Sequence, residues 1–387
     1  MPFALYLLAL AVFAQSTSEF MLSGLLPDIA RDLGVSVPAA GTLTSAFALG
    51  MIAGAPLMAL LGRRRPRRQA LLVFLSVFLL VHVVGALTDD FGVLLATRVL
   101  AALAHAGFLA IGLTAATGMV APDAKGRATS VLLGGTTLAC VVGVPAGAGL
   151  GHLFGWRSAF WAVALLSAPA LAAIARSVPG DRAEPAGAGP GVRAELRVLR
   201  RPRLLVTLAL AALVNGATFC TFTYLAPLAT EVTGLGAAWV PGVLALFGVG
   251  AFAGVTWAGR LADRRPLPVL AAGGAALLIG WLLLALGAGN AVATLLLVPV
   301  LGALAFGVGS TLITRVLYEA VDAPSLAGAF ATSALNVGAA LGPVLGGAAL
   351  DGGLGYRAPV WVSALLVGAA PAALGFVRRG GRERQVG

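Results

Sequence analysis

The chain has 387 residues, of which 59% are hydrophobic and only 11% are charged, and its mean hydropathy is +0.97. This composition leaves too little polar surface for a soluble globular protein, so the expected solvent is a lipid bilayer. The formal net charge of +11 is not carried by any long basic soluble segment, which excludes a nucleic-acid-binding domain and a nucleic-acid partner.

Long apolar runs follow one another along the whole chain. Crossing ~30 Å of hydrocarbon takes about 20 apolar residues in a helix. The runs show no alternation of period two, which excludes an outer-membrane barrel. We therefore predict an all-α membrane protein with twelve transmembrane helices, expected near residues 3–26, 40–62, 69–88, 92–118, 128–151, 158–176, 204–228, 238–260, 267–287, 291–318, 326–350 and 358–377.

The basic residues predict the orientation of these spans. Lys and Arg are retained on the cytoplasmic side of short loops. With the N-terminus inside, most of the 26 basic residues fall in cytoplasmic segments, where they also attract anionic membrane lipids. Both termini are therefore expected in the cytoplasm. The first span has no basic n-region and is expected to be retained rather than cleaved.

The chain contains an internal repeat with an offset of 200 residues. The shift superposes Pro27 on Pro227 and Arg157 on Arg357, together with several glycines and an Arg-Arg-Pro run. Six spans precede the end of each copy, so the copies are parallel repeats about an axis along the membrane normal. We predict an N-terminal half at 1–176, a cytoplasmic linker at 177–203 and a C-terminal half at 204–387 with a short basic tail. Residues 194–201 of the linker form either a short surface helix or flexible chain.

Glu19 is the only carboxylate that lies well inside an apolar span. A charged side chain costs free energy there, so one that is retained is expected to have a function. The first and fourth spans place Glu19 and Arg98 at nearly the same depth in the membrane. A conformational change that altered their separation would load or release a proton. We predict that Glu19 carries the proton and that Arg98 modulates it; the alternative is a static ion pair that orients two helices.

Three polar residues of the first half are candidates for substrate binding. Gln15 and Ser23 lie at helical spacing from Glu19, on a face expected to point towards a cavity. His105 follows Arg98 by seven residues and so lies on the same face of its span. A packing histidine is the alternative for His105.

The second half has no counterpart of Glu19, because the repeat places Phe219 there. This asymmetry assigns the proton to the first half and leaves the second half freer to bind substrate. Apolar walls with a few hydrogen-bonding groups suit a small amphipathic molecule, and packing between helices is the alternative for each residue. The candidates are Asn215, Phe222, Tyr224 and Asn336.

Glycine and proline occur together inside two spans. Gly143, Pro145 and Gly147 lie in the fifth span, and Gly342 and Pro343 lie in the eleventh. Proline interrupts a helix and small neighbours let helices move past one another, so we predict hinges; static kinked packing is the alternative. Cys140 and Cys220 are expected to be buried thiols, with no metal site.

Several of these motifs resemble the major facilitator superfamily, and within it the twelve-span drug/proton antiporters. Gly259-Arg260-Leu261-Ala262-Asp263-Arg264 resembles the loop signature of a half, Gly143-Val144-Pro145-Ala146-Gly147 the antiporter motif, and Arg98 the fourth-span arginine. The first-half loop has Arg64 but no aspartate where the second half has Asp263. The resemblance therefore implies gating roles for Arg64, Gly259, Asp263 and Arg264, with an asymmetric lock.

The stretch from Thr17 to Ala30 resembles actinobacterial chloramphenicol-resistance exporters, and this similarity extends over nearly the whole chain. It implies a monomeric antiporter in a bacterial plasma membrane that expels a small drug and admits protons, with the proton gradient in place of a cofactor. A sugar or nucleoside efflux carrier is the main alternative. A membrane-embedded enzyme would need a nucleophile with a base or clustered metal ligands within the spans, and no such group occurs. An ion channel is disfavoured by the two-half repeat.

Overall fold

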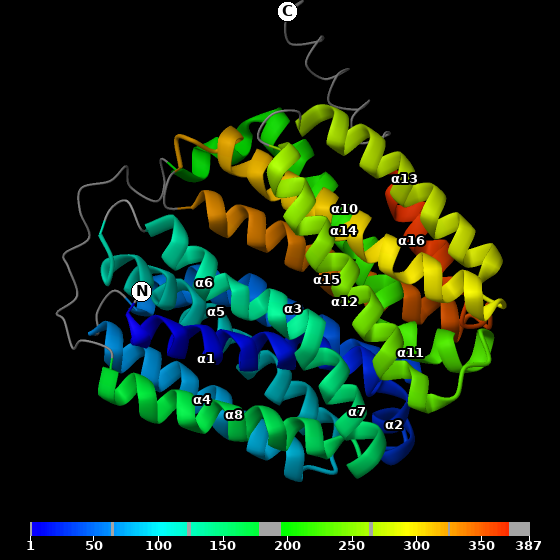
Figure 1. Ribbon diagram of the computed structural model, residues 1–387, viewed down its shortest axis with the longest axis horizontal. Coiled ribbons are helices and arrows are strands. Elements are labelled where there is room, and N and C mark those ends of the chain that lie inside the picture. The colour runs from blue at the N-terminus through cyan, green and yellow to red at the C-terminus, as the bar shows by residue number, and fades with distance from the viewer. Residues whose placement is uncertain are drawn as a thin grey trace, which may run out of the picture. The chain divides into compact units, whose positions relative to one another are not determined.

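The computed structural model describes residues 2–62, 66–121, 125–177, 195–262, 266–323 and 326–370, and all regular structure in these ranges is helical (Figure 1). Eleven spans in the described ranges are long and apolar enough to cross a membrane. The chain is thus a multi-pass membrane protein. The twelfth expected span begins as α16, and residues 371–377 of it lie outside the described residues.

Contacts divide the chain into two compact units. The first comprises residues 1–187 and 236–248, and the second comprises residues 188–235 and 249–387. The halves expected at 1–176 and 204–387 remain a prediction.

The first unit is built around α1. This helix packs against α8 and against the segment from α6 to α7, while α4 packs on α5 and α8, and α3 packs on α5. Figure 1 shows α1, α4 and α8 running side by side. The helices are α1 (Phe3–Phe20), α2 (Leu26–Asp32), α3 (Val37–Gly62), α4 (Arg67–Leu87), α5 (Phe91–Gly118), α6 (Lys125–Leu138), α7 (Val144–Phe154) and α8 (Arg157–Ser177).

Two spans of the first unit are interrupted. A 3-10 turn, η1 (Met21–Gly24), follows α1 directly, so the α-helix ends at Phe20, before the end of the expected span 3–26. A π-helical turn, η3 (Ala139–Gly143), separates α6 from α7 just before Pro145. Proline has no N–H to donate, and π-turns inside α-helices are rare and concentrate at functional sites.

The second unit is centred on α10, which packs against α15, α16 and α14; α13 packs on α14 and α16. Its helical elements are η4 (Arg197–Arg200), α10 (Pro202–Thr223), α11 (Leu225–Pro227), η5 (Leu228–Val232), α13 (Pro266–Gly287), α14 (Ala291–Glu319), α15 (Ala327–Asp351) and α16 (Ala358–Gly368). The short η6 (Ala237–Trp239) belongs to the first unit, and α12 (Val240–Ala262) runs from the first unit into the second.

Equivalent positions of the repeat end and begin helices in the same way. The Asp90 side chain accepts the N–H of Val93 at the start of α5, and Asn290, 200 residues later, accepts the N–H of Ala293 at the start of α14. Gly155 and Gly355 both adopt positive φ, at 82° and 72°, a conformation that favours glycine. The repeat thus extends to the caps and turns of the individual helices.

The end of the expected linker folds onto the second unit. Val198 of η4 is buried among residues of α10, α14 and α15, and the Glu195 side chain accepts the backbone N–H of Leu326 at 3.0 Å. Of the two alternatives for residues 194–201, this favours a short helix for the described part.

Candidate functional site

Glu19 lies in the last turn of α1, immediately after four polar residues that are all buried. Gln15, Ser16, Thr17 and Ser18 are at most 5% exposed, whereas Glu19 itself is partly exposed. The Ser16 hydroxyl is 2.9 Å from that of Thr136 on α6, which ties this polar face of α1 to its neighbour. The acid is therefore carried at the accessible end of a buried polar segment.

Arg98 of α5 reaches this segment and is held there by three interactions. Its Nη1 donates to Ser18 Oγ at 2.8 Å and its Nη2 donates to the Ser18 carbonyl at 2.7 Å. The guanidinium carbon lies 4.6 Å from the centre of the Phe47 ring on α3. The Arg98 side chain is 1% exposed, so an always-charged group is buried here. It is bonded to Ser18, the residue that precedes Glu19 in the chain.

Glu19 and Arg98 are close enough to interact electrostatically, but they are not joined directly. Within the described part of the chain, the Glu19 carboxylate accepts no hydrogen bond and forms no ion pair within 4.0 Å. A carboxylate left without hydrogen bonds beside a fixed cation can gain or lose a proton without breaking a bond within the protein. The arrangement differs from a static ion pair.

His105 contacts the ring of Phe47 and the backbone of Gln15. The His105 ring is in edge contact with Phe47, with ring centres 6.1 Å apart, and it interacts with the backbone of Gln15. Both residues are at most 2% exposed, yet both amide atoms of Gln15 and the Nδ1 of His105 find no partner among the described residues. Buried polar atoms without partners are uncommon, and they suit a site that receives a polar ligand.

Ser23 does not join this group, because its hydroxyl donates to the carbonyl of Phe20 in its own turn.

The antiporter motif packs directly on the helix that carries Glu19. A Cβ added at Gly143 would overlap Thr17 Oγ1, and one added at Gly147 would lie 3.3 Å from the Cβ of Met21. Glycines at these positions therefore let η3 approach α1 at Thr17 and let α7 approach η1 at Met21, on either side of Glu19 along the chain. Pro145 follows the π-turn at the first residues of α7.

The predicted residues of the second unit are engaged with other residues of that unit. The Asn215 side chain donates to the carbonyl of Leu335 on α15, and Asn336 donates to Thr332 one turn back. Phe222 is 8% exposed and makes an edge contact with Phe219. The Tyr224 hydroxyl donates to the Pro343 carbonyl. These contacts favour the alternative of packing between helices.

The second hinge motif repeats the close approach of the first. A Cβ at Gly342 would overlap backbone atoms of α10, including the carbonyl of Gly216. Of the loop residues, Gly259 is in the last turn of α12 and its surroundings are not described, while Arg64, Asp263 and Arg264 lie outside the described residues. Cys140 and Cys220 are free thiols, and the described residues contain no cluster of three potential metal ligands.

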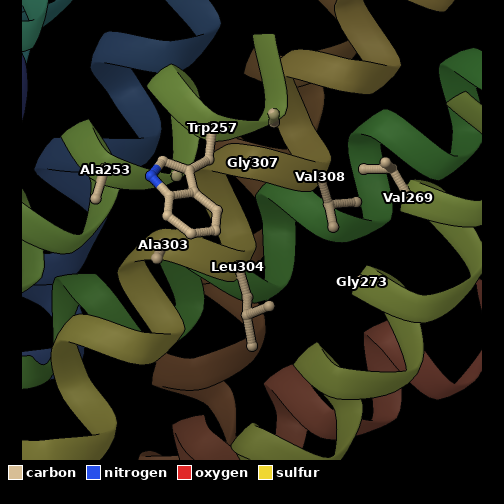
Figure 2. A pocket seen from close by; sticks show the side chains of 10 residues that line it. Ala253, Trp257, Val269, Gly273, Ala303, Leu304, Gly307 and Val308 are labelled. Atoms are coloured by element: carbon tan, nitrogen blue, oxygen red, sulfur yellow. The ribbon is translucent and has the colours of Figure 1, made fainter. Parts of the chain in front are cut away.

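An apolar pocket with a volume of ≈ 260 Å³ lies among α12, α13 and α14 of the second unit. Figure 2 shows the Trp257 indole at this pocket, with Leu304 and Val308 nearby. The Trp257 N–H is the one polar side-chain group among its lining residues. The pocket includes none of the predicted site residues.

Ser18 and His82 belong to the site and were not predicted. His82 of α4 is 2% exposed, and its Nε2 lies 2.6 Å from Ser18 Oγ. Spacing along a single helix cannot show this contact, because the two residues are 64 positions apart. The one available signal was a histidine in the middle of an apolar span, where polar residues are expensive.

A helical membrane protein of two related sets of spans, with an acid and an arginine brought together inside one of them, has the architecture of a solute transporter. The chain belongs to the Major Facilitator Superfamily, whose family model matches residues 8–334. It is therefore a transporter and not an enzyme.

Relatives cover nearly the whole chain. A "Chloramphenicol resistance protein" of Streptomyces lividans is 57% identical over 371 residues, which cover 96% of this chain and 95% of that protein. The "Inner membrane transport protein YdhP" of Escherichia coli (strain K12) is 38% identical over 370 residues, which cover 95% of this chain and 94% of the relative.

Solved structures show the same fold at low identity. A crystal structure of the nucleoside transporter NupG matches with a TM-score of 0.77 at 12% identity, over 96% of this chain and 99% of that one. A crystal structure of a bacterial homologue of the human lysosomal transporter Spinster, in an inward-facing and unoccupied conformation, matches with a TM-score of 0.72 at 18% identity. The match covers 97% of this chain and 96% of that one.

Proposed function

We propose that this protein exports chloramphenicol and admits protons in exchange, by alternating access. The drug assignment is supported by the extensive similarity to the Streptomyces chloramphenicol resistance protein. The observation that carries proton coupling is the contrast between the two ionisable groups: Arg98 is sealed and bonded to Ser18, whereas Glu19 is partly exposed and unbonded. One of them is built to stay charged and the other to change its charge.

In this mechanism Glu19 takes up a proton from the outer side of the membrane and becomes neutral. Neutralisation removes its attraction to Arg98, so the helix pair α1 and α5 has different electrostatics before and after proton uptake. The proton leaves on the cytoplasmic side in the other conformation. Exchange of one proton for one neutral drug molecule would move one charge per cycle, so the membrane potential and the pH difference would both drive export.

Gln15 and His105 are the strongest candidates for drug contacts, because each has buried polar atoms without a partner and the His105 ring lies against the Phe47 ring. An aromatic face with hydrogen-bonding groups suits a small aromatic, polar drug. Asn215, Phe222, Asn336 and Ser23 remain weaker candidates, and for Tyr224 the hydrogen bond to the Pro343 carbonyl favours packing over a drug contact. We also propose a monomer in the bacterial plasma membrane with both termini cytoplasmic, in contact with anionic lipid.

Export of a sugar or nucleoside is the second candidate function. The fold similarity to NupG fits it, but at 12% identity this similarity concerns the fold alone. The two functions differ in the solute that is moved and not in the role given to Glu19.

The test is transport in proteoliposomes with an imposed pH gradient, with and without an uncoupler. Chloramphenicol, a pentose and a nucleoside are compared as solutes. We expect gradient-driven movement of chloramphenicol that the uncoupler abolishes. Movement of only the sugar or the nucleoside would overturn the drug assignment.

Glu19→Gln tests proton coupling in the same vesicles. The variant should lose gradient-driven transport while retaining downhill exchange of the drug, because glutamine preserves the shape of the side chain but cannot ionise. The matched control is Glu231→Gln, which changes an exposed carboxylate in η5 of the second unit. Full proton-driven transport by Glu19→Gln would exclude Glu19 as the proton site.

A further inference from the structure

His82, Ser18 and Arg98 form a continuous hydrogen-bonded chain across three helices. His82 Nδ1 lies 2.7 Å from the Phe78 carbonyl, and its Nε2 lies 2.6 Å from Ser18 Oγ. Ser18 Oγ in turn accepts Arg98 Nη1 at 2.8 Å. All three side chains are buried, and Ser18 directly precedes Glu19.

The direction of each bond in this chain follows from what the groups can donate. A carbonyl oxygen only accepts, so Nδ1 of His82 carries a hydrogen. In a neutral imidazole the other nitrogen, Nε2, is then an acceptor, and the hydrogen between it and Ser18 Oγ comes from the serine. The lone pairs of Ser18 Oγ are left facing Arg98, which donates to them.

The surroundings favour this neutral form of His82. The imidazole is 2% exposed, with the centres of the Phe78 and Phe160 rings 4.2 Å and 5.8 Å from its own, so water cannot solvate a charge on it. A charged imidazole would also stand one hydroxyl away from the Arg98 cation. Its Nε2 would become a second donor to Ser18 Oγ and would turn the serine hydrogen away.

We infer that His82 is a positioning residue for the proton site: by accepting the Ser18 hydroxyl hydrogen, it fixes the acceptor that holds Arg98 away from Glu19. The inference rests on the proposed role of Glu19 and adds a residue to it. With His82 in place, Arg98 satisfies Nη1 and Nη2 on Ser18 and leaves the carboxylate unbonded. Without it, the Ser18 hydroxyl rotates freely, and Arg98 gains by pairing with the charged form of Glu19.

Among the described residues, few ionisable groups face this network. They are Arg98 and His105 on α5, Cys140 in η3, and Glu19 itself. α3 has no ionisable residue, and α8 has only Arg157 and Arg176, at its two ends. A changed pH response in a His82 variant would therefore report on the pairing of Glu19 with Arg98.

The experiment compares His82→Phe, His82→Gln and Ser18→Ala in drug/proton exchange as a function of pH. His82→Phe keeps a flat ring against Phe78 and Phe160 but removes the acceptor. In this variant the pH at which drug/proton exchange is half-maximal should fall by about one unit, because a closer Arg98 cation stabilises the ionised carboxylate of Glu19. Ser18→Ala should do the same, and the double variant should add nothing further. His82→Gln places an amide oxygen near the Nε2 position and should restore the wild-type profile.

Two controls separate this inference from folding and from the proposed function. Thermal unfolding in detergent reports whether the three variants fold, and His152→Phe, at an exposed histidine of α7, should leave the pH profile unchanged. A wild-type pH profile in both His82→Phe and Ser18→Ala would overturn the role of His82. That result would stand even if Glu19→Gln had lost proton-driven transport as expected. If His82→Phe does not fold, the profiles of Ser18→Ala and His82→Gln decide the question by the same criteria. Full coupling in Glu19→Gln would instead remove the proposed proton site.

Discussion

The Tyr224 hydroxyl donates a 2.8 Å hydrogen bond to the backbone carbonyl of Pro343, and so joins the C-terminal end of α10 to the proline of α15. The Tyr224 ring also fills the space beside Gly346, where an added Cβ would lie 3.0 Å from its Cε2. Tyr224 is 1% exposed. These contacts connect it to the second hinge motif rather than to an open cavity.

Tyr224→Phe should therefore lower stability and leave drug affinity unchanged. The ring remains, and the loss of one buried hydrogen bond costs about 1 kcal/mol. Thermal unfolding in detergent measures the first effect and equilibrium drug binding the second. Tyr318→Phe is the control, because Tyr318 is 72% exposed and the loss of its hydroxyl group should have no effect. Weaker binding at unchanged stability would instead support the drug contact predicted from the sequence.

Gly143→Ala should impair transport by forcing η3 away from α1. The added methyl overlaps Thr17 Oγ1 and lies 3.1 Å from both Thr17 Cβ and Cγ2, so rotation of the threonine cannot relieve all of the contacts. Overpacking of this kind costs about 1–3 kcal/mol. Stability and drug export of Gly143→Ala are compared with those of Gly134→Ala, where an added Cβ has no neighbour within 4 Å.

Thr17→Ala tests the cause of this effect. Combined with Gly143→Ala, it removes Oγ1 and Cγ2 and should restore part of the stability and transport. Equal defects in the single and double variants would mean that the glycine is needed for backbone freedom and not for close approach.

The spans, the repeat and the acid–arginine pair could be predicted because each leaves a mark along the chain. Hydrophobic length reports the spans, and an isolated charge such as Glu19 or Arg98 stands out in an apolar run. Even the caps of α5 and α14 appear at one offset, as Asp90 and Asn290.

The contacts between helices could not be predicted in this way. Ser18 lies between Arg98 and His82 only because α1, α4 and α5 meet, and no single helix contains that information. The sequence also placed the substrate residues mainly in the second half, whereas the partnerless buried amide is that of Gln15 in the first. Polar residues such as Asn215 look alike in sequence whether they bond a neighbouring backbone or await a ligand.

The stability of the first unit should depend on pH through Asp32, which lies at the end of α2 outside the membrane spans. The hydrogen bonds donated by Arg157 and Trp156 lower the pKa of the Asp32 carboxyl, and Arg157 also pairs with Asp89 at 2.6 Å. A lowered native pKa stabilises the fold above the unfolded-state pKa of about 3.9, and this stabilisation is lost as the pH falls through the native value. Asp32→Asn should therefore lower the melting temperature at pH 7, and the difference from wild type should vanish at strongly acidic pH.

The effect should stay within about 1 kcal/mol, because the Asp32 side chain is 46% exposed. Asp28→Asn is the matched control, since Arg31 on its own helix is the one partner of Asp28 among the described residues. If the melting temperature of Asp32→Asn stayed below that of wild type by the same amount at acidic pH, the carboxylate charge of Asp32 would not be the source of the stabilisation.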